Sequence, residues 1–444
     1  MSKSAKQSSI VLVDGCRIPF QKPGTGYRHF QVHDLARFVI RGMIDRNGID
    51  PQKVDRVIMG NVIQNRNTGN VAREAALGAG LPVSVIAYTV AMSCLSSHMA
   101  ITIAAEQILS GQADVIIAGG ADSVSSHLAR FPLKKYKPLP FVTEFSTGES
   151  MGMYADRLAA LFGISREAQD AYTVRSHQSA VKAFEGHFPD EELIPVAGPP
   201  EFEPVLKDNG IRPDNTPARL AILKPLYDKK FGTVTAANGF HHADGAAAVL
   251  LMRESTAEDL GLAPKVRLKS WVYTAHDPKE EMLLGQAYAI PKLLDGIRMK
   301  ANDIDVYELH EAFASQVLAV LEAMSSVNFA KDRLGKPKAA GPVPLKKLNT
   351  LGGSLALGHP FGATGARLVT TAANRLIREK GAYALVSSCA GGGQGHALLL
   401  ESVAANAAPK TRKMARTSAS KKAASTAGTV RKSGKKPENK PQTK

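Results

Sequence analysis

The chain has 444 residues, of which 44% are hydrophobic, and it carries a formal net charge of +16. This length predicts a globular protein of two or three domains, and no run approaches the ~20 apolar residues that a membrane-spanning helix requires. Three cysteines, Cys16, Cys94 and Cys389, are too few for the framework of a small disulfide-rich secreted protein and favour thiol chemistry in a reducing compartment.

The first 125 residues alternate between strand-like and helical patterns. Residues 8–20 and 53–63 have the composition of strands, residues 33–48 have helical spacing, residues 98–111 predict a helix that ends at Gly111, and residues 113–123 predict a buried strand. The opening "MSKSAKQSSI" has neither the apolar core of a secretory signal nor a long Arg-rich amphipathic segment. We therefore expect a bacterial cytoplasmic protein.

Cys94 lies in "SCLSSHMA", where a strand-like run passes into a helix. A thiol at a helix N-terminus meets unsatisfied N–H groups and the positive end of the dipole, which favours the thiolate and suits a nucleophile. A buried, inert cysteine is the competing interpretation and the more frequent one for a lone cysteine. His98 does not complete a metal site with Cys94, because no other ligands follow at the spacing of a zinc site.

Residues 126–231 break this pattern into short helices interrupted by Pro, Lys and Arg. The segment is too long for a plain loop, so we expect an inserted, partly helical subdomain that covers an active site. After it the first plan returns: residues 303–324 predict a strand and a helix, residues 365–381 a helix, and residues 382–389 a buried strand. This alternation favours a mostly parallel, layered α/β protein of two similar halves.

Two histidines in the second half lie at turns. His310, in "VYELHEAF", follows a predicted strand and precedes a helix, a common place for site residues in α/β folds, although a capping or core histidine is the alternative. His359, in "LGGSLALGHPFGATGARL", is flanked by glycines that let backbone approach a ligand and by Pro360, which stiffens the turn. The alternative is a tight connection with a satisfied histidine; the motif is neither a P-loop nor a dinucleotide fingerprint.

Cys389 ends the last predicted strand in "SSCAGGGQGH". The three glycines that follow place backbone N–H groups beside the thiol without side chains that would block a substrate. Two thiols and two histidines, each at a strand end or a turn, suit a reaction that needs a nucleophile, a base and an oxyanion site.

The C-terminal segment is strongly basic. Residues 410–444 hold twelve Lys or Arg and one acidic residue, and so carry +11 of the net charge. With almost no large apolar residues, this tail is expected to be disordered. It could bind nucleic acid or another anionic partner non-specifically, but it has no aromatic residues for stacking and no helix to read a groove.

Several segments together resemble the thiolases, which cleave 3-ketoacyl-CoA or condense acyl-CoA. The resemblance is carried by "CAGGGQG", by "GGSLALGHPFGATGAR", and by "HEAF" in place of the commoner Asn-Glu-Ala-Phe, and it extends over residues 8–402. His in that last motif, and Phe after His-Pro, are typical of the trifunctional-enzyme β-subunit branch of the family.

This resemblance implies a five-layered αβαβα fold of two duplicated halves with an inserted loop domain that binds coenzyme A. It assigns residues 1–125 and 232–262 to the first half, 126–231 to the loop domain, 263–402 to the second half and 403–444 to the tail. It also implies an oligomer, either a homodimer or a dimer of dimers, and a hydratase/dehydrogenase α-subunit as a candidate partner. Peripheral membrane association is a weaker implication.

The resemblance also implies roles for single residues. Cys94 would attack the keto carbonyl, His359 would activate it, and Cys389 would protonate the departing acetyl-CoA enolate and later deprotonate CoA. His310 would hold a water at the enolate oxygen, and the N–H groups of Cys94 and Gly391 would form a second oxyanion hole. CoA would be a co-substrate, with no permanent cofactor and no metal, and its contacts would include Ser150, Met151 and Phe240.

The leading hypothesis is therefore a 3-ketoacyl-CoA thiolase of fatty-acid β-oxidation that acts on medium or long chains. An acetoacetyl-CoA thiolase that condenses two acetyl-CoA is the alternative within the family. Non-specific binding of anions or nucleic acid through the basic tail is the alternative from another class.

Overall fold

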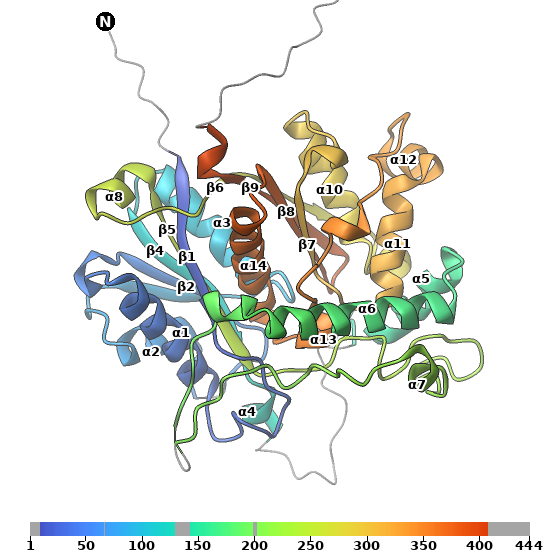
Figure 1. Ribbon diagram of the computed structural model, residues 1–444, viewed down its shortest axis with the longest axis horizontal. Coiled ribbons are helices and arrows are strands. Elements are labelled where there is room, and N and C mark those ends of the chain that lie inside the picture. Colours follow the sequence, from blue (N-terminus) through green and yellow to red (C-terminus); the bar gives the residue numbers. More distant parts are fainter. Residues whose placement is uncertain (1–8, 66, 129–142, 199–201, 407–444) are drawn as a thin grey trace, which may run out of the picture. The chain divides into compact units, whose positions relative to one another are not determined.

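The computed structural model describes residues 9–65, 67–128, 143–198 and 202–406, which belong to one compact unit. Figure 1 shows a central sheet with helices on its faces. In these ranges no helix combines the length and the apolar character needed to cross a bilayer.

A single nine-stranded sheet runs through the molecule in the order β3-β2-β4-β5-β1-β6-β9-β8-β7. The strands are β1 (Ile10–Arg17), β2 (Arg56–Gly60), β3 (Ile86–Val90), β4 (Val115–Asp122), β5 (Gly245–Arg253), β6 (Val266–Ala275), β7 (Val306–Leu309), β8 (Tyr383–Ala390) and β9 (Gln394–Ser402). The two halves meet where β1 and β6 pair through Val11 and Leu12.

Each half follows the same path through the sheet. The first strand of each half, β1 or β6, pairs antiparallel with the last, β5 or β9, which in turn pairs antiparallel with β4 or β8. Next to these lies a parallel pair, β2 with β4 and β7 with β8. Among the strands of the described residues, β3 alone has no counterpart in the second half, where a parallel bridge between Tyr307 and Leu348 takes its place. The prediction of two duplicated halves is confirmed.

The expectation of a mostly parallel sheet is wrong, because the sheet is mixed and more of its strand pairs are antiparallel. A parallel pair needs a crossover connection, whereas β8 and β9 are joined by the short turn that contains Gly391, Gly392 and Gly393, and a turn of that length forms a hairpin. The glycine triplet therefore reverses the chain as well as exposing backbone.

The helices complete five layers around the two halves of the sheet (Figure 1). Helices α1 (Val32–Asn47) and α2 (Val71–Gly78) cover the first half, and α10 (Gly285–Gly296) and α11 (Ala314–Ser325) cover the second. Between the halves, α3 (Ser96–Leu109) packs against α14 (Thr364–Arg378). The outer helix α1 shows the one-sided apolar stripe of a surface helix, whereas α14 is buried from Thr364 to Leu376.

The inserted segment is partly helical, as expected. Its helices are α5 (Met151–Leu161), α6 (Arg166–Glu185) and α7 (Pro217–Ala221), preceded by α4 (Val124–Leu128). Helices α5 and α6 pack on α11, and α6 also packs on the short helix α13 (Ser354–Leu357). Residues 129–142 and 199–201 of this insertion lie outside the described residues, and its boundaries stay a prediction.

The basic tail also lies outside the described residues from 407 onward. Residues 403–406, which the sequence assigns to the tail, instead form a short 3₁₀ turn, Val403–Asn406, at the end of β9. The Val403 carbonyl accepts a hydrogen bond from Arg267, which ties the start of this turn to β6.

Candidate active site

Cys94 stands on a tight turn between β3 and α3. Ser93 has a φ of 48°, a left-handed conformation that is uncommon for a non-glycine residue. The Ser96 hydroxyl accepts a hydrogen bond from the Met92 N–H and donates one to the Ser93 carbonyl, which fixes the turn. The strained turn presents the Cys94 side chain at the start of α3, as the sequence predicts.

The thiol of Cys94 contacts an imidazole directly. Its Sγ lies 3.2 Å from His359 Nε2. Burial raises the pKa of the Cys94 thiol to about 12, while hydrogen bonds from the backbone N–H groups of Cys94 and Gly391 oppose the shift. The expected stabilisation of a thiolate at the helix N-terminus is therefore outweighed by desolvation, and the resting sulfur is a neutral thiol.

His359 is held as a neutral base behind Cys94. Its Nδ1 lies 2.6 Å from Thr364 Oγ1, and its backbone N–H donates to the His241 carbonyl. Burial, and to a smaller extent the neighbouring His310, lowers the pKa of His359 well below its usual value. Phe240 packs its ring edge-to-face with the imidazole, with centroids 4.9 Å apart. The ring is thus oriented with Nε2 toward the sulfur.

His310 adjoins the same pair. Its ring centroid is 4.3 Å from that of His359, and a ring nitrogen of each lies within 4.8 Å of the other and of Cys94 Sγ. The residue follows β7 and precedes α11, where the sequence places it. Burial, followed by the charge of Arg367, lowers the pKa of His310 to about 3, so this imidazole is also neutral.

The second thiol lines the same cavity as Cys94 and His310. Cys389, near the end of β8, is buried, and burial together with nearby Cys94 raises the pKa of its thiol. At Gly391 an added Cβ would come 3.2 Å from Met151 Cε and 3.6 Å from Glu144 Oε2. Glycine therefore leaves room between the hairpin turn and the inserted segment.

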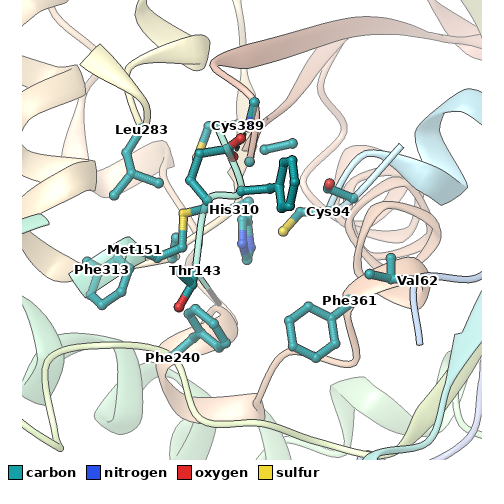
Figure 2. A pocket seen from close by; sticks show the side chains of 17 residues that line it. Val62, Cys94, Thr143, Met151, Phe240, Leu283, His310, Phe313, Phe361 and Cys389 are labelled. Atoms are coloured by element: carbon teal, nitrogen blue, oxygen red, sulfur yellow. Dashed lines mark hydrogen bonds between the residues drawn. The ribbon is translucent and has the colours of Figure 1, made fainter. Parts of the chain in front are cut away.

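Cys94, His310, Cys389 and Gly391 all line one cavity of about 470 Å³. Figure 2 shows the first three around a shared space, with Phe240 and Phe361 on its walls. The apolar part of the lining includes Val62, Met151, Phe240, Leu283, Phe313 and Phe361. The fold thus brings together the two thiols, which are 295 positions apart in the sequence, and His359 stands directly behind the wall.

Of the three predicted CoA contacts, two line this cavity. Met151 and Phe240 are in its wall. Ser150 is not, because its side chain caps α5 by accepting a hydrogen bond from the Met153 N–H. Ser150 therefore has a structural role at the start of α5, next to Met151.

Asp122, at the end of β4, is a site residue that the sequence reasoning missed. Its buried carboxylate accepts hydrogen bonds from the N–H groups of Val62, Ile63 and Gly362. It thereby ties together the loops that carry Val62 and Phe361 in the cavity wall. An acidic residue at the end of a long apolar strand is the sequence signal that could have indicated it.

The fold and this constellation define an enzyme of the thiolase family, and the chain belongs to that family. The family model of the thiolase N-terminal domain matches residues 10–255, and that of the C-terminal domain matches residues 262–402.

Two relatives are similar to this chain over most of its length. The chain is 47% identical over 422 residues to the mitochondrial trifunctional enzyme subunit beta of Mus musculus, covering 88% of each chain. It is 42% identical over 420 residues to the 3-ketoacyl-CoA thiolase of Yersinia pestis (strain Pestoides F), covering 88% of this chain and 96% of the relative.

Two solved structures are also similar to this chain over most of its length. The human mitochondrial 3-ketoacyl-CoA thiolase in complex with CoA is similar with a TM-score of 0.79 and 30% identity, over 89% of this chain and 98% of that one. The Bacillus anthracis acetyl-CoA acetyltransferase has a TM-score of 0.79 and 33% identity, over 89% and 99%.

Proposed function

We propose that this thiolase is an acyltransferase that cleaves 3-ketoacyl-CoA with CoA to give acetyl-CoA and a chain-shortened acyl-CoA in fatty-acid β-oxidation. The observation that carries the proposal is the meeting of two thiols, Cys94 and Cys389, at one cavity with His359 in contact with the first. The relatives named as 3-ketoacyl-CoA thiolases support the same reaction.

In the first half-reaction Cys94 is the nucleophile. As Sγ attacks the keto carbonyl, its proton passes to His359 Nε2, 3.2 Å away. The developing oxyanion lies beside the N–H groups of Cys94 and Gly391, which already point at the sulfur. The bond between C2 and C3 then breaks, leaving the shortened acyl group on Cys94 and acetyl-CoA as an enolate, which takes a proton from Cys389.

In the second half-reaction the proton flow reverses. The Cys389 thiolate accepts the proton of an incoming CoA thiol, and the CoA sulfur attacks the thioester on Cys94. Acyl-CoA leaves, and Cys94 recovers its proton from His359. One thioester replaces another at little thermodynamic cost. CoA acts as a co-substrate, with Met151 and Phe240 as its contacts in the cavity wall and Ser150 beside them.

The acyl chain that we propose is medium or long. Support comes from the largely apolar lining, with four phenylalanines, one methionine and one leucine among its members. The alternative, an acetoacetyl-CoA thiolase that works in the condensing direction, is supported by the likeness to an acetyl-CoA acetyltransferase.

Thiolysis rates on two substrates separate these functions. The proposal predicts turnover of both 3-ketohexadecanoyl-CoA and acetoacetyl-CoA, with a higher kcat/KM for the longer chain. Turnover of acetoacetyl-CoA without detectable thiolysis of the longer substrate would replace the proposal by its alternative. Absence of both activities would refute the thiolase function itself.

We further propose a homodimer or dimer of dimers, associated with a hydratase/dehydrogenase α-subunit. Strand β3 supports self-association: in the described part of the chain it pairs with β2 alone, so one edge is unpaired, and Ile86 is 55% exposed. The likeness to the trifunctional enzyme subunit beta supports the α-subunit. Sedimentation of the full chain alone tests the first proposal, since a monomer at assay concentration contradicts it.

The cellular location that we propose is the bacterial cytoplasm, with peripheral contact to a membrane or another anionic partner through the basic tail. The charge of +11 on residues 410–444 supports an anionic partner. Fractionation of cells into soluble and membrane pools, at low and high salt, tests this proposal.

A further inference from the structure

His310 has one ring nitrogen engaged and one without a partner. Nδ1 lies 3.1 Å from Ser354 Oγ, whereas Nε2 is buried and has no hydrogen-bond partner among the described residues. The residue lines the cavity, and Figure 2 shows its ring facing that space. A buried polar atom without a partner beside a ligand cavity indicates a group that is satisfied by the ligand.

Ser354 connects this imidazole to a buried cation. Its Oγ lies 3.2 Å from Arg367 Nη2 as well as 3.1 Å from His310 Nδ1. A guanidinium can only donate, so the Ser354 oxygen accepts from Arg367. The hydroxyl proton is then directed away from the cation, and Nδ1 is the acceptor that lies within reach.

The opposite arrangement is disfavoured on the same contacts. If Nδ1 carried the proton and donated to Ser354, the hydroxyl proton would have no acceptor among the described residues. A buried donor left without a partner costs about 1–3 kcal/mol. The arrangement in which Nδ1 accepts gives the Ser354 hydroxyl both a donor and an acceptor, and it leaves Nε2 as the imidazole nitrogen open to a ligand.

The position of the cation is itself fixed. Arg367 is fully buried in α14, and its Nη1 lies 3.5 Å from Glu308 Oε2. The other oxygen of Glu308 binds Arg375 at 2.7 Å. The charge beside Ser354 is therefore held by a buried ion-pair network between α14 and β7.

We propose that Arg367 and Ser354 are positioning residues that hold His310 as the neutral tautomer with its proton on Nε2. In this tautomer Nε2–H donates directly to the thioester oxygen of acetyl-CoA as the enolate forms, so the reaction does not require a bridging water at this residue. The identity of that oxygen rests on the proposed function, whereas the tautomer does not.

Kinetics with three variants test the role in the reaction. Ser354→Ala is expected to lower kcat for thiolysis by roughly tenfold, with little change in KM. This loss is smaller than the ~10²–10³ lost when an oxyanion donor itself is removed. Ser354→Thr keeps the hydroxyl and should restore most of kcat. Ser315→Ala is the control, because it removes another buried hydroxyl, one that donates to the Ala155 carbonyl, and should leave kcat unchanged.

A double-mutant cycle separates positioning from a general structural effect. In the His310→Ala background, Ser354→Ala should cause no further loss of kcat, because its effect passes through the imidazole. Equal losses in both backgrounds, or a Ser354→Ala enzyme as fast as the wild type, would overturn the proposal.

Nuclear magnetic resonance tests the tautomer without any substrate. In full-length protein labelled with ¹⁵N-histidine, the signals that disappear in His310→Ala should show a protonated Nε2 and an unprotonated Nδ1. Ser354→Ala should shift them toward a mixture of tautomers, and Ser315→Ala should not. A proton on Nδ1 in the wild type would refute the inference, while a wild-type enzyme without thiolysis would refute only the proposed function.

Discussion

At the scale of single residues, the reacting pair is uncharged at rest. Burial raises the pKa of the Cys94 thiol to about 12 and lowers the pKa of His359 well below 6.5. A preformed thiolate–imidazolium pair would require two charges in a largely apolar wall that includes Phe240 and Phe361. Proton transfer therefore accompanies attack on the substrate, when the N–H groups of Cys94 and Gly391 can receive the new negative charge on oxygen.

This neutrality predicts a flat pH profile for acylation. Between pH 6 and 8 the Cys94 thiol stays protonated, because its pKa is about 12, and His359 stays unprotonated, because its pKa lies well below 6.5. The rate of acetyl-CoA release in a single turnover without free CoA should thus vary little across this range. A rate that rises in proportion to hydroxide concentration would show instead that the Cys94 thiol loses its proton to solvent before it attacks, and not to His359 during the attack.

At the scale of elements, one glycine turn and one clamp, the hydrogen bonds that Asp122 accepts from two loops, determine the shape of the cavity. The β8–β9 turn needs glycine because Gly392 and Gly393 have φ values of 82° and 65°, and because Gly391 lies against Met151. Across the cavity, Asp122 holds the loops of Val62 and Gly362 by backbone hydrogen bonds.

The glycine turn predicts the effect of a single methyl group. Gly391→Ala places a Cβ 3.2 Å from Met151 Cε and at the cavity surface, so we expect a shifted N–H at the oxyanion site and a kcat lowered by roughly tenfold to 10³-fold. Gly296→Ala is the matched control, since no atom lies within 4 Å of the added Cβ. Steady-state thiolysis compares the two, and equal activity of both variants would exclude a role for the space at Gly391.

The clamp predicts a change in stability and in its pH dependence. Asp122→Asn removes an acceptor from buried backbone N–H groups, which should lower the free energy of unfolding by about 1–3 kcal/mol. Burial raises the folded-state pKa of Asp122 from 3.8 to about 7, so the native state binds more protons than the unfolded state between these values. The stabilising contribution of this raised pKa to the free energy of unfolding is complete below pH ~4 and is lost as the pH rises through about 7.

Urea unfolding at a series of pH values measures both effects. The wild type should show the larger decrease in stability between pH 4 and 7, and Asp122→Asn a smaller one, because the amide does not titrate. A variant with the same slope as the wild type would show that Asp122 is ionised throughout this range.

At the scale of the whole molecule, the sequence predicts the strands and helices within each half better than it predicts how the two halves pair in the sheet. The strands and helices around Cys94, His310 and Cys389 follow the predicted order, because apolar periodicity and glycine mark their ends. The pairing of β1 with β6 depends on contacts between distant segments, which periodicity does not encode. For the same reason the sequence does not reveal the buried contacts of Ser354 and Arg367.

The body of the protein should function without its basic tail. The family match ends at residue 402 and the compact unit at Ala407, whereas residues 410–444 carry +11 charges. Deletion of residues 408–444 is expected to leave kcat and KM for thiolysis unchanged and to reduce retention on DNA at low salt. Loss of turnover in the truncated chain would contradict the view that the tail is dispensable for catalysis.

The most direct test of the account is mass spectrometry of the full chain mixed with 3-ketoacyl-CoA in the absence of free CoA. We expect the shortened acyl group on the peptide that contains Cys94, acetyl-CoA in solution, and no adduct on the peptide of Cys16, whose buried thiol donates to the Val39 carbonyl. Release of acetyl-CoA with Cys94 unmodified, or an acyl group carried by Cys389 instead, would contradict the assignment of the nucleophile.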